Sequence, residues 1–287
     1  MSKESPMTDP EVSERLRQKL GEAVVELKAD EIGVAFSGGV DSSLLAKLCL
    51  DAGKNVTLLT VGFNDDADIK VASEVAGSLG LKLCAEVVSL EELEDGLRRA
   101  LGNIEFGRMV RFENCVCFYY VFRLASRHNL RTVASANGLD ELFCGYSVYK
   151  ARYGNENSIK SFMKELADVA RGDKAEMDKL ASLYKVDYAC PFMSGGFVDY
   201  AMRVPLSQKM KGADDDLRKR ILRKAALDLG VPPQSALKPK KAFQYSSGVH
   251  KAIRELARNR GFTKAKAKAA GFRGEVEAYV NYLKGIA

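Results

Sequence analysis

The chain has 287 residues, of which 46% are hydrophobic and 29% are charged. This length and balance are typical of a soluble globular protein with a full-sized core and exclude a disordered chain. No apolar run approaches the roughly 18–20 residues that a membrane span needs, and the polar N-terminal segment has no apolar stretch of the signal-peptide kind. We therefore expect a cytoplasmic protein without membrane contact.

The first predicted element is an amphipathic helix. It begins at Asp9-Pro10, an N-cap followed by a proline at the first helical position. Its apolar residues recur at helical spacing, at Val12, Leu16, Leu20, Val24 and Leu27.

Four short apolar strands follow this helix and alternate with further helices. The strands are predicted at 32–36, 56–61, 83–88 and 132–135. The helices are predicted at 42–52, 67–79, from about 90, at 112–127 and from about 140. Such alternation is typical of parallel βαβ units, so we expect an α/β fold with a parallel twisted sheet flanked by helices.

The second half of the sequence shows helices and loops but no clear strand from about residue 154 onward. We therefore divide the chain into an N-terminal helix (1–30), an α/β core (31–153) and a mainly helical region packed on that core (154–287). Ligands on parallel sheets bind at the carboxyl ends of the strands. Two of these ends, Phe36 and Ser135, lead directly into unusual loops.

The loop after Phe36 reads Ser37-Gly38-Gly39-Val40-Asp41-Ser42-Ser43. The glycines allow the backbone to approach an anion closely, and the amides at the start of the following helix are donors at its positive dipole end. A carboxylate at Asp41 would repel phosphates unless a cation lay between them, and Mg²⁺ resolves that conflict. The loop is neither a Walker sequence nor a GxGxxG pattern.

This loop resembles the SGGxDS signature of the ATP pyrophosphatase superfamily, whose members cleave ATP to AMP and pyrophosphate. The resemblance implies ATP and Mg²⁺ as cofactors and an adenine nucleotide alpha hydrolase-like fold. It also implies that Ser37, Gly38, Gly39, Val40, Asp41, Ser42 and Ser43 bind the nucleotide. The motif alone does not identify the substrate.

The second loop, from Ser135 to Tyr146, reads SANGLDELFCGY and resembles the S-G-[ED]-G-x-D-E-x-F-G-G-Y signature of the asparagine synthetase C-terminal (synthetase) domain. The resemblance places Gly138 at the nucleotide and makes Asp140, with Asp41, a carboxylate that holds Mg²⁺ on the departing pyrophosphate. By itself, Asp140 could also be part of an acidic first turn of a helix.

Three further segments resemble the same family. Thr60 to Phe63 is similar to the segment that lies against adenine and ribose, which assigns Val61 and Gly62 to the nucleotide. Pro191-Phe192 and the residues up to Pro205 are similar to the P-F-L-D segment and its helix. The run from Lys238 to Phe243 is similar to R-x-K-x-x-F, which makes Lys240 a catalytic contact of the α-phosphate.

The sequence departs from this family at several positions. Asn137 stands where the family has an acidic residue in the substrate and ammonia region. As an amide it can orient an acceptor but cannot act as a base. Ala189, Ser194 and Lys238 replace an arginine, an aspartate and an arginine of the family pattern. These changes weaken the case for aspartate as the acceptor. About thirty residues precede the first strand, without an N-terminal cysteine nucleophile, so we expect free ammonia, an ammonia-supplying glutaminase subunit or another nucleophile.

The leading interpretation is an ATP-dependent, asparagine synthetase-like ligase that adenylates a small carboxylate or amide substrate and transfers a nitrogen nucleophile to it. An alternative is an adenylating sulfur-transfer enzyme that acts on tRNA or a cofactor. A third is a non-catalytic nucleotide-binding subunit of a larger amidotransferase.

The alternatives rest on charge and cysteine placement. Lys and Arg outnumber Asp and Glu by more than two to one from Pro205 onward. This excess is typical either of a nucleic-acid-binding surface or of helices whose charged faces are simply solvated. The solvated surface is favoured because no aromatic RNA-binding signature accompanies the charge. Cys144 and Cys190 flank family segments and would be the thiols of a sulfur transfer. The six cysteines form no CxxC pair, and with two histidines they leave few ligands for zinc.

Overall fold

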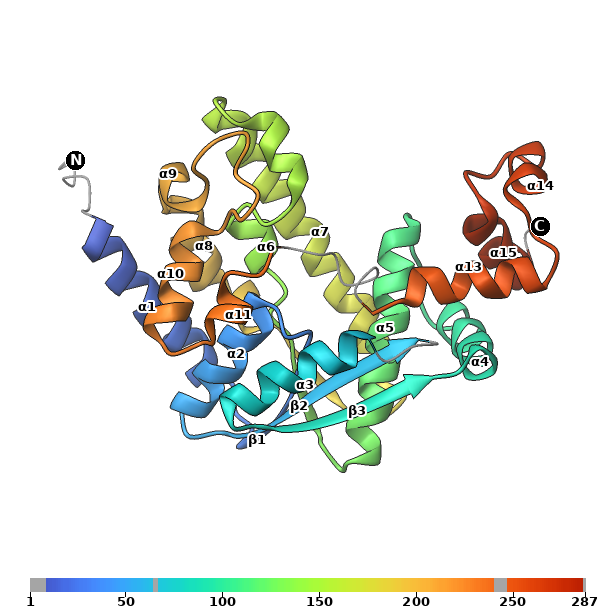
Figure 1. Cartoon of the computed structure of the whole chain (residues 1–287), viewed down its shortest axis with the longest axis horizontal. Coiled ribbons are helices and arrows are strands. Elements are labelled where there is room, and N and C mark those ends of the chain that lie inside the picture. The colour runs from blue at the N-terminus through green and yellow to red at the C-terminus, as the bar shows by residue number, and fades with distance from the viewer. Residues whose placement is uncertain (1–8, 64–66, 240–246, 286–287) are drawn as a thin grey trace.

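The computed structural model describes residues 9–63, 67–239 and 247–285, and its centre is a five-stranded parallel sheet (Figure 1). The strand order is β3-β2-β1-β4-β5. The strands are β1 (Glu31–Ala35), β2 (Asn55–Phe63), β3 (Lys82–Val88), β4 (Thr132–Ala134) and β5 (Asp187–Ala189). Val34 of β1 pairs with Leu58 of β2 on one side and with Ala134 of β4 on the other. The predicted fold class is confirmed.

Both faces of the sheet are buried, as is usual for parallel strands. Because successive side chains point to opposite faces, Leu58 and Leu59 of β2 belong to two different apolar cores, and both are fully buried. Runs of apolar residues and threonine such as Val56 to Val61 are therefore the sequence signature of this sheet.

The first core is covered by helices from both ends of the chain. They are α1 (Asp9–Val25), α2 (Val40–Asp51), α3 (Ala67–Leu79), α8 (Gly195–Arg203), α10 (Arg220–Asp228) and α11 (Pro233–Ala236). In α1 the predicted apolar residues Val12, Leu16 and Leu20 are at most 3% exposed. Figure 1 shows α1, α10 and α11 beside α2 at the left of the sheet.

The second core lies on the other face. It is formed with α4 (Leu90–Leu101), α5 (Met109–Arg127), the end of α7 (Glu156–Ser182), α13 (Val249–Asn259) and α15 (Glu275–Leu283). The short α14 (Lys264–Ala269) packs on α15. No helix among the described residues is both long and apolar enough to cross a membrane.

The fifth strand corrects the sequence analysis, which expected no strand after residue 154. β5 pairs in parallel with β4, with Val133 opposite Tyr188. The strand has only three residues and forms the edge of the sheet. So short a segment, following directly on the long helix α7, carries no readable alternation of apolar residues. It matters for function because Tyr188 lies beside the loop that follows β4.

The chain winds outward from β1 through β2 to β3, then returns to place β4 on the other side of β1. This creates a switch in strand order between β1 and β4, where ligands bind in open parallel sheets. The remaining short elements are α6 (Leu139–Leu142), α9 (Leu206–Lys209) and the 3-10 helices η1 (Ser147–Arg152) and η2 (Pro191–Met193). The loops after β1 and β4 both leave the sheet at this switch point.

Candidate active site between the first and fourth strands

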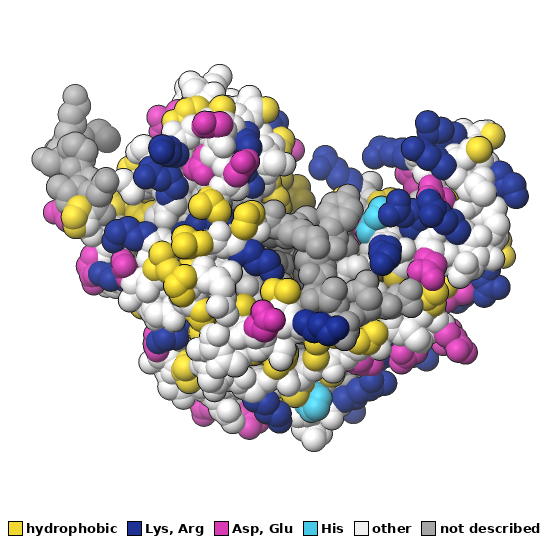
Figure 2. Space-filling view, viewed as in Figure 1, with side chains coloured by type: hydrophobic (Ala, Val, Ile, Leu, Met, Phe, Trp, Pro, Cys, Tyr) yellow, Lys and Arg dark blue, Asp and Glu magenta, His cyan; other side chains and the backbone are white. Residues whose placement is uncertain are grey.

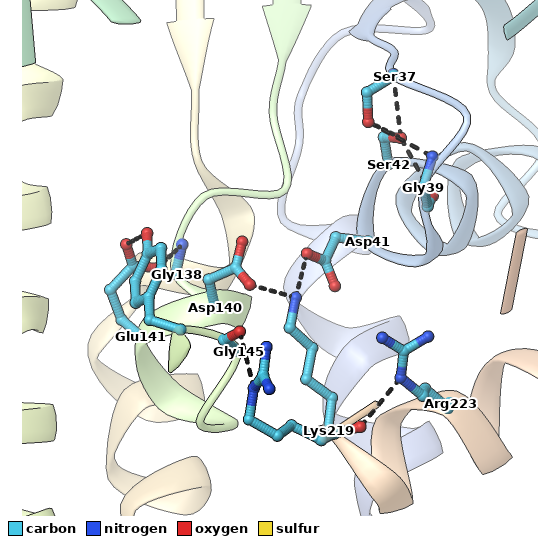
Figure 3. Close-up of polar contacts among 12 residues, drawn as sticks. Ser37, Gly39, Asp41, Ser42, Gly138, Asp140, Glu141, Gly145, Lys219 and Arg223 are labelled. Carbon is cyan, nitrogen blue, oxygen red and sulfur yellow. Dashed lines mark hydrogen bonds and ion pairs between the residues drawn. The ribbon is translucent and has the colours of Figure 1, made fainter. Parts of the chain in front are cut away.

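The loop after β1 is a tight turn that leads into α2. Gly38 has φ +66°, a conformation that favours glycine, and a Cβ there would lie 3.3 Å from the Cα of Ala72. The Ser42 Oγ accepts a hydrogen bond from the Ser37 amide at 3.2 Å and donates to the Gly39 carbonyl at 3.3 Å. These bonds hold the loop against the first turn of α2, as the dashed lines in Figure 3 show.

The other members of this loop face the protein. Ser43 is fully buried, and its Oγ accepts a hydrogen bond from the Ser235 Oγ of α11 at 2.8 Å. Val40 is 5% exposed and belongs to the first core. The carboxylate of Asp41, in the first turn of α2, points instead toward the loop that follows β4 (Figure 3).

The loop after β4 is shaped by Gly138. Its φ is +104°, and a Cβ there would lie 2.6 Å from the Met193 Sδ and 2.9 Å from the Phe192 carbonyl, so no larger residue fits without rearrangement. The Gly138 amide donates to the Glu141 Oε2 at 3.0 Å, and the Tyr146 hydroxyl donates to Glu141 Oε1 at 2.6 Å. Glu141 therefore braces the loop, while Asp140 points into the site.

Lys219 joins the two loops. Its Nζ lies 2.5 Å from Asp41 Oδ2 and 2.5 Å from Asp140 Oδ1, and its side chain is 1% exposed. Figure 3 shows it rising between the two carboxylates. Asp41 and Asp140 are thus brought together on a lysine ammonium, and their role as Mg²⁺ ligands stays a prediction. Gly145 permits this approach, because a Cβ there would lie 1.9 Å from Asp140 Oδ1 and 2.4 Å from Lys219 Cε.

An unusual backbone turn delivers Lys219 to the carboxylates. Arg218 and Lys219 have φ of 48° and 50°, the left-handed region that L-residues other than Asn and Asp rarely adopt. Asp215 Oδ1 accepts the amides of Leu217 at 3.1 Å and Arg218 at 2.8 Å. Burial disfavours the charged form of Asp215, but the backbone amides outweigh it and hold the pKa of this carboxyl below its usual value.

Arg223 is a second buried cation beside Lys219. Its Nε donates to the Arg218 carbonyl at 2.9 Å, and its Nη1 donates to the carbonyls of Ala236 at 2.6 Å and Lys238 at 2.9 Å. Burial lowers the pKa of this guanidinium, and the charges of Asp41 and Asp140 oppose that shift. Nη2 is buried and has no hydrogen-bond partner among the described residues, so one donor remains to bind an anion.

Sequence reasoning missed Lys219, Arg223 and Gly145. A signal was present, because Lys219 and Arg223 lie four apart and flank the apolar pair Ile221-Leu222. A Lys or Arg that falls on the apolar face of a predicted helix is expected to be buried, and a buried charge needs an ion-pair or hydrogen-bond partner. The partners, far away in sequence, could not be read from the pattern.

Asn137 lies in the loop after β4 and is hydrogen-bonded to a residue of β5. Its Nδ2 donates to the Tyr188 hydroxyl at 3.0 Å, and that hydroxyl lies 2.7 Å from the Ser135 Oγ. Burial raises the pKa of Tyr188 well above its ordinary value, so the ring stays a neutral hydrogen-bonding group. Asn137 is therefore oriented by Tyr188, on the side of the loop that faces β5.

The remaining predicted residues fall in two places. Val61 and Gly62 are buried near the end of β2, beside β1, and the Phe63 amide donates to the Ser247 carbonyl at 3.1 Å. Lys240 lies outside the described residues. Among the described residues, no three His, Cys, Asp or Glu side chains form a group that could hold a metal ion.

Comparisons with known proteins identify relatives over most of the chain. The family model described as asparagine synthase matches residues 15–173 and 159–278. A putative asparagine synthetase of Methanocaldococcus jannaschii is 29% identical over 270 residues, covering 83% of this chain and 49% of that protein. Asparagine synthetase B of Escherichia coli is 27% identical over 250 residues, covering 82% of this chain and 44% of that protein. This chain therefore spans less than half the length of these curated relatives.

Two solved structures match the chain with lower similarity. NMN synthetase from Francisella tularensis has a TM-score of 0.43 and 16% identity, with 98% of this chain and 94% of that chain covered. NH3-dependent NAD synthetase from Campylobacter jejuni has a TM-score of 0.34 and 18% identity, with 62% and 93% covered. Both scores are below 0.5, so the relationship rests on the sequence matches.

Proposed function

Because this chain belongs to the asparagine synthase family, we propose that it binds ATP at the switch point between β1 and β4 and cleaves it between the α and β phosphates to form an adenylate. One observation carries the proposal: Asp41 and Asp140, from two separate strand ends, are held on a single buried cationic atom beside the glycine loop. Sites with this placement suit a polyanion and its counter-ions.

Asp41 and Asp140 fit Mg²⁺. Carboxylate oxygens are the ligands this ion prefers, and it usually takes one or two of them together with substrate phosphates. Asp41 Oδ1 is buried without a hydrogen-bond partner among the described residues, so a coordinating atom is in place. When bound, Mg²⁺ neutralises charge on the departing pyrophosphate.

The basic residues act on the phosphates. The Lys219 Nζ exchanges its carboxylate contacts for phosphate oxygens when ATP enters. Arg223 Nη2 adds a donor from the same side. Lys240, which the family resemblance places at the α-phosphate, stabilises the charge that develops there in the transition state. The amides and hydroxyls of residues 37–43 and the amide of Gly138 position the nucleotide, with Val61 and Gly62 beside it.

In the reaction, a carboxylate or amide oxygen of the acceptor attacks the α-phosphorus, and the bond to the bridging oxygen of the β-phosphate breaks. Pyrophosphate leaves, and the acceptor carries AMP. Ammonia then attacks the activated carbon, AMP departs, and a proton is released to solvent. Asn137, oriented by Tyr188, positions the acceptor by hydrogen bonds and does not act as a base.

A nitrogen nucleophile is favoured over a thiol. Cys144 is fully buried, and burial raises the pKa of its thiol to about 11. Burial also raises the pKa of Cys190. Nucleophilic cysteines instead have lowered pKa values and accessible sulfur atoms. The relatives are named as glutamine-hydrolysing enzymes, which supports ammonia as the nucleophile.

Pyrophosphate release tests this function. The protein is assayed with ATP, MgCl₂ and ammonium against a panel of carboxylic acids that includes aspartate. We expect acid-dependent pyrophosphate and AMP, and a loss on the order of 100-fold or more in Asp41→Asn and Asp140→Asn. Asp228→Asn, at the far end of α10, is the matched control and should retain activity. Absence of release with every acid, or full activity in Asp140→Asn, contradicts the proposal.

A further inference from the structure

The net charge of the protein is concentrated in one part of the fold. Residues 247–285, which form α13, α14 and α15, contain nine Lys and Arg residues against three Asp and Glu. This excess of six equals the formal net charge of the whole chain. The rest of the protein is therefore neutral as a whole, and these three helices, called here the basic lobe, form a separate electropositive unit.

The basic lobe is anchored with its charges outward. The apolar residues of α13 pack on α4 and α5 in the second core: Val249, Ala252, Ile253, Leu256 and Ala257. Two arginines of the lobe are paired: Arg258 with Glu275 of the lobe itself at 3.1 Å, and Arg260 with Glu94 of α4 at 2.8 Å.

Four cations of the lobe have side chains exposed to solvent: Lys264, Lys266, Lys268 and Arg273. Figure 2 shows Lys and Arg side chains gathered on this lobe, at the right of the molecule. A rigid scaffold presents them, because Thr263 caps α14 by accepting the Lys266 amide at 3.3 Å and Ala267 is buried below.

An exposed aromatic ring lies on the same lobe. Tyr282 is 51% exposed, and its ring lies 5.4 Å from that of Phe262. Phe262 in turn contacts the buried Tyr279 at 5.6 Å. The Tyr282 ring is therefore held by packing on one side and open on the other, which is the arrangement on which an unpaired base stacks.

We propose that the basic lobe is a docking surface for RNA, which contacts Lys264, Lys266, Lys268 and Arg273 through its phosphates and stacks an unpaired base on Tyr282. A membrane surface is disfavoured because interfacial helices bury an exposed apolar face in lipid, and the apolar face of α13 is already buried in the core. An acidic protein would also match the charge, so its binding to the lobe is one outcome of the test. The inference goes beyond the proposed ATP chemistry and does not depend on it.

Binding is measured without ATP, by fluorescence anisotropy of a labelled 20-nucleotide RNA of mixed sequence at 50–200 mM KCl. The lobe variant carries Lys264→Glu, Lys266→Glu, Lys268→Glu and Arg273→Glu. We expect it to bind on the order of 100-fold more weakly at 100 mM salt. The slope of log K against log salt should become shallower by about 3, since each lost phosphate contact contributes about 0.7.

A control variant with the same net charge separates the effect of where the cations lie from the effect of net charge. It carries Lys28→Glu, Lys82→Glu, Lys164→Glu and Lys185→Glu, four exposed lysines outside the lobe. We expect a loss of less than about 3-fold, because charges beyond a Debye length of about 10 Å are screened. Equal losses in the two variants overturn the proposal, because they would show that binding follows net charge alone.

Tyr282→Ala separates stacking from charge. We expect a 5- to 100-fold loss of affinity, as one base stacked on an aromatic ring contributes roughly 1–3 kcal/mol, with an unchanged salt slope. Thermal melting of all variants verifies folding. No RNA binding by the wild-type chain overturns the proposal. So does tighter binding to phosphatidylserine vesicles or polyglutamate than to the RNA. None of these outcomes bears on pyrophosphate release, so failure here is distinguishable from failure of the proposed function.

Discussion

Replacing Lys219 by methionine removes the cation that joins the two halves of the site. The substitution keeps the volume of the side chain but leaves the carboxylates of Asp41 and Asp140, 16% and 12% exposed, facing each other without the ammonium between them. Removing one partner of a buried ion pair destabilises a protein by about 3–5 kcal/mol. With a melting shift of about 2–4 °C per kcal/mol for a chain approaching this size, we expect the melting temperature to fall by about 10 °C in EDTA.

Urea unfolding monitored by circular dichroism in EDTA measures this loss. The matched control is Lys224→Met in α10, whose side chain is 63% exposed and pairs with Asp228; it should change stability by less than about 0.5 kcal/mol. Adding MgCl₂ should raise the melting temperature of Lys219→Met more than that of the wild type, because the carboxylates can then bind a divalent ion. A Lys219→Met protein within about 1 kcal/mol of wild type in EDTA refutes the bridging role.

The remaining predictions concern neighbouring groups. Gly145→Ala places a Cβ 1.9 Å from Asp140 Oδ1, so we expect about 1–3 kcal/mol of destabilisation in urea and loss of pyrophosphate release; wild-type behaviour contradicts the observed packing. Burial lowers the pKa of Lys209 to about 8 from 10.5, so the unfolded state binds more protons between these values and wild-type stability should rise with pH across this window. Lys209→Met lacks this titration. The free energy of unfolding of the variant minus that of the wild type should therefore be about 2–3 kcal/mol larger at pH 7 than at pH 10. A difference that does not change with pH refutes the lowered pKa of Lys209. Tyr188→Phe removes the hydroxyl that holds Asn137 and should raise KM for the acceptor with little change in KM for ATP; an equal rise in both values contradicts this role.

The elements around the site were readable from the sequence because their signals are local. Apolar runs bounded by glycine mark β1 and β2, and two loops of unusual composition follow Phe36 and Ser135. Since parallel strands present their carboxyl ends at one edge, the meeting of Asp41 and Asp140 also followed from the pattern. The family resemblance drawn from these loops is confirmed by the match to the family model.

What the sequence did not reveal depends on contacts between distant segments. Lys219 reaches the carboxylates through a left-handed turn that Asp215 and Arg223 stabilise by bonds to backbone groups, and no local propensity predicts such a turn. β5 was missed because three residues carry too little periodicity. The hydrogen bond between Asn137 and Tyr188 could not be predicted either, since Tyr188 belongs to β5.

Cleavage of ATP between its α and β phosphates is tested most directly with γ-³²P-labelled ATP, in the presence of MgCl₂, ammonium and the acid that supports release. If Asp41, Asp140 and Lys219 hold the pyrophosphate as proposed, the label leaves as pyrophosphate with a matching amount of AMP. Release of the label as orthophosphate with accumulation of ADP would show cleavage at the γ-phosphate and contradict the proposed adenylation.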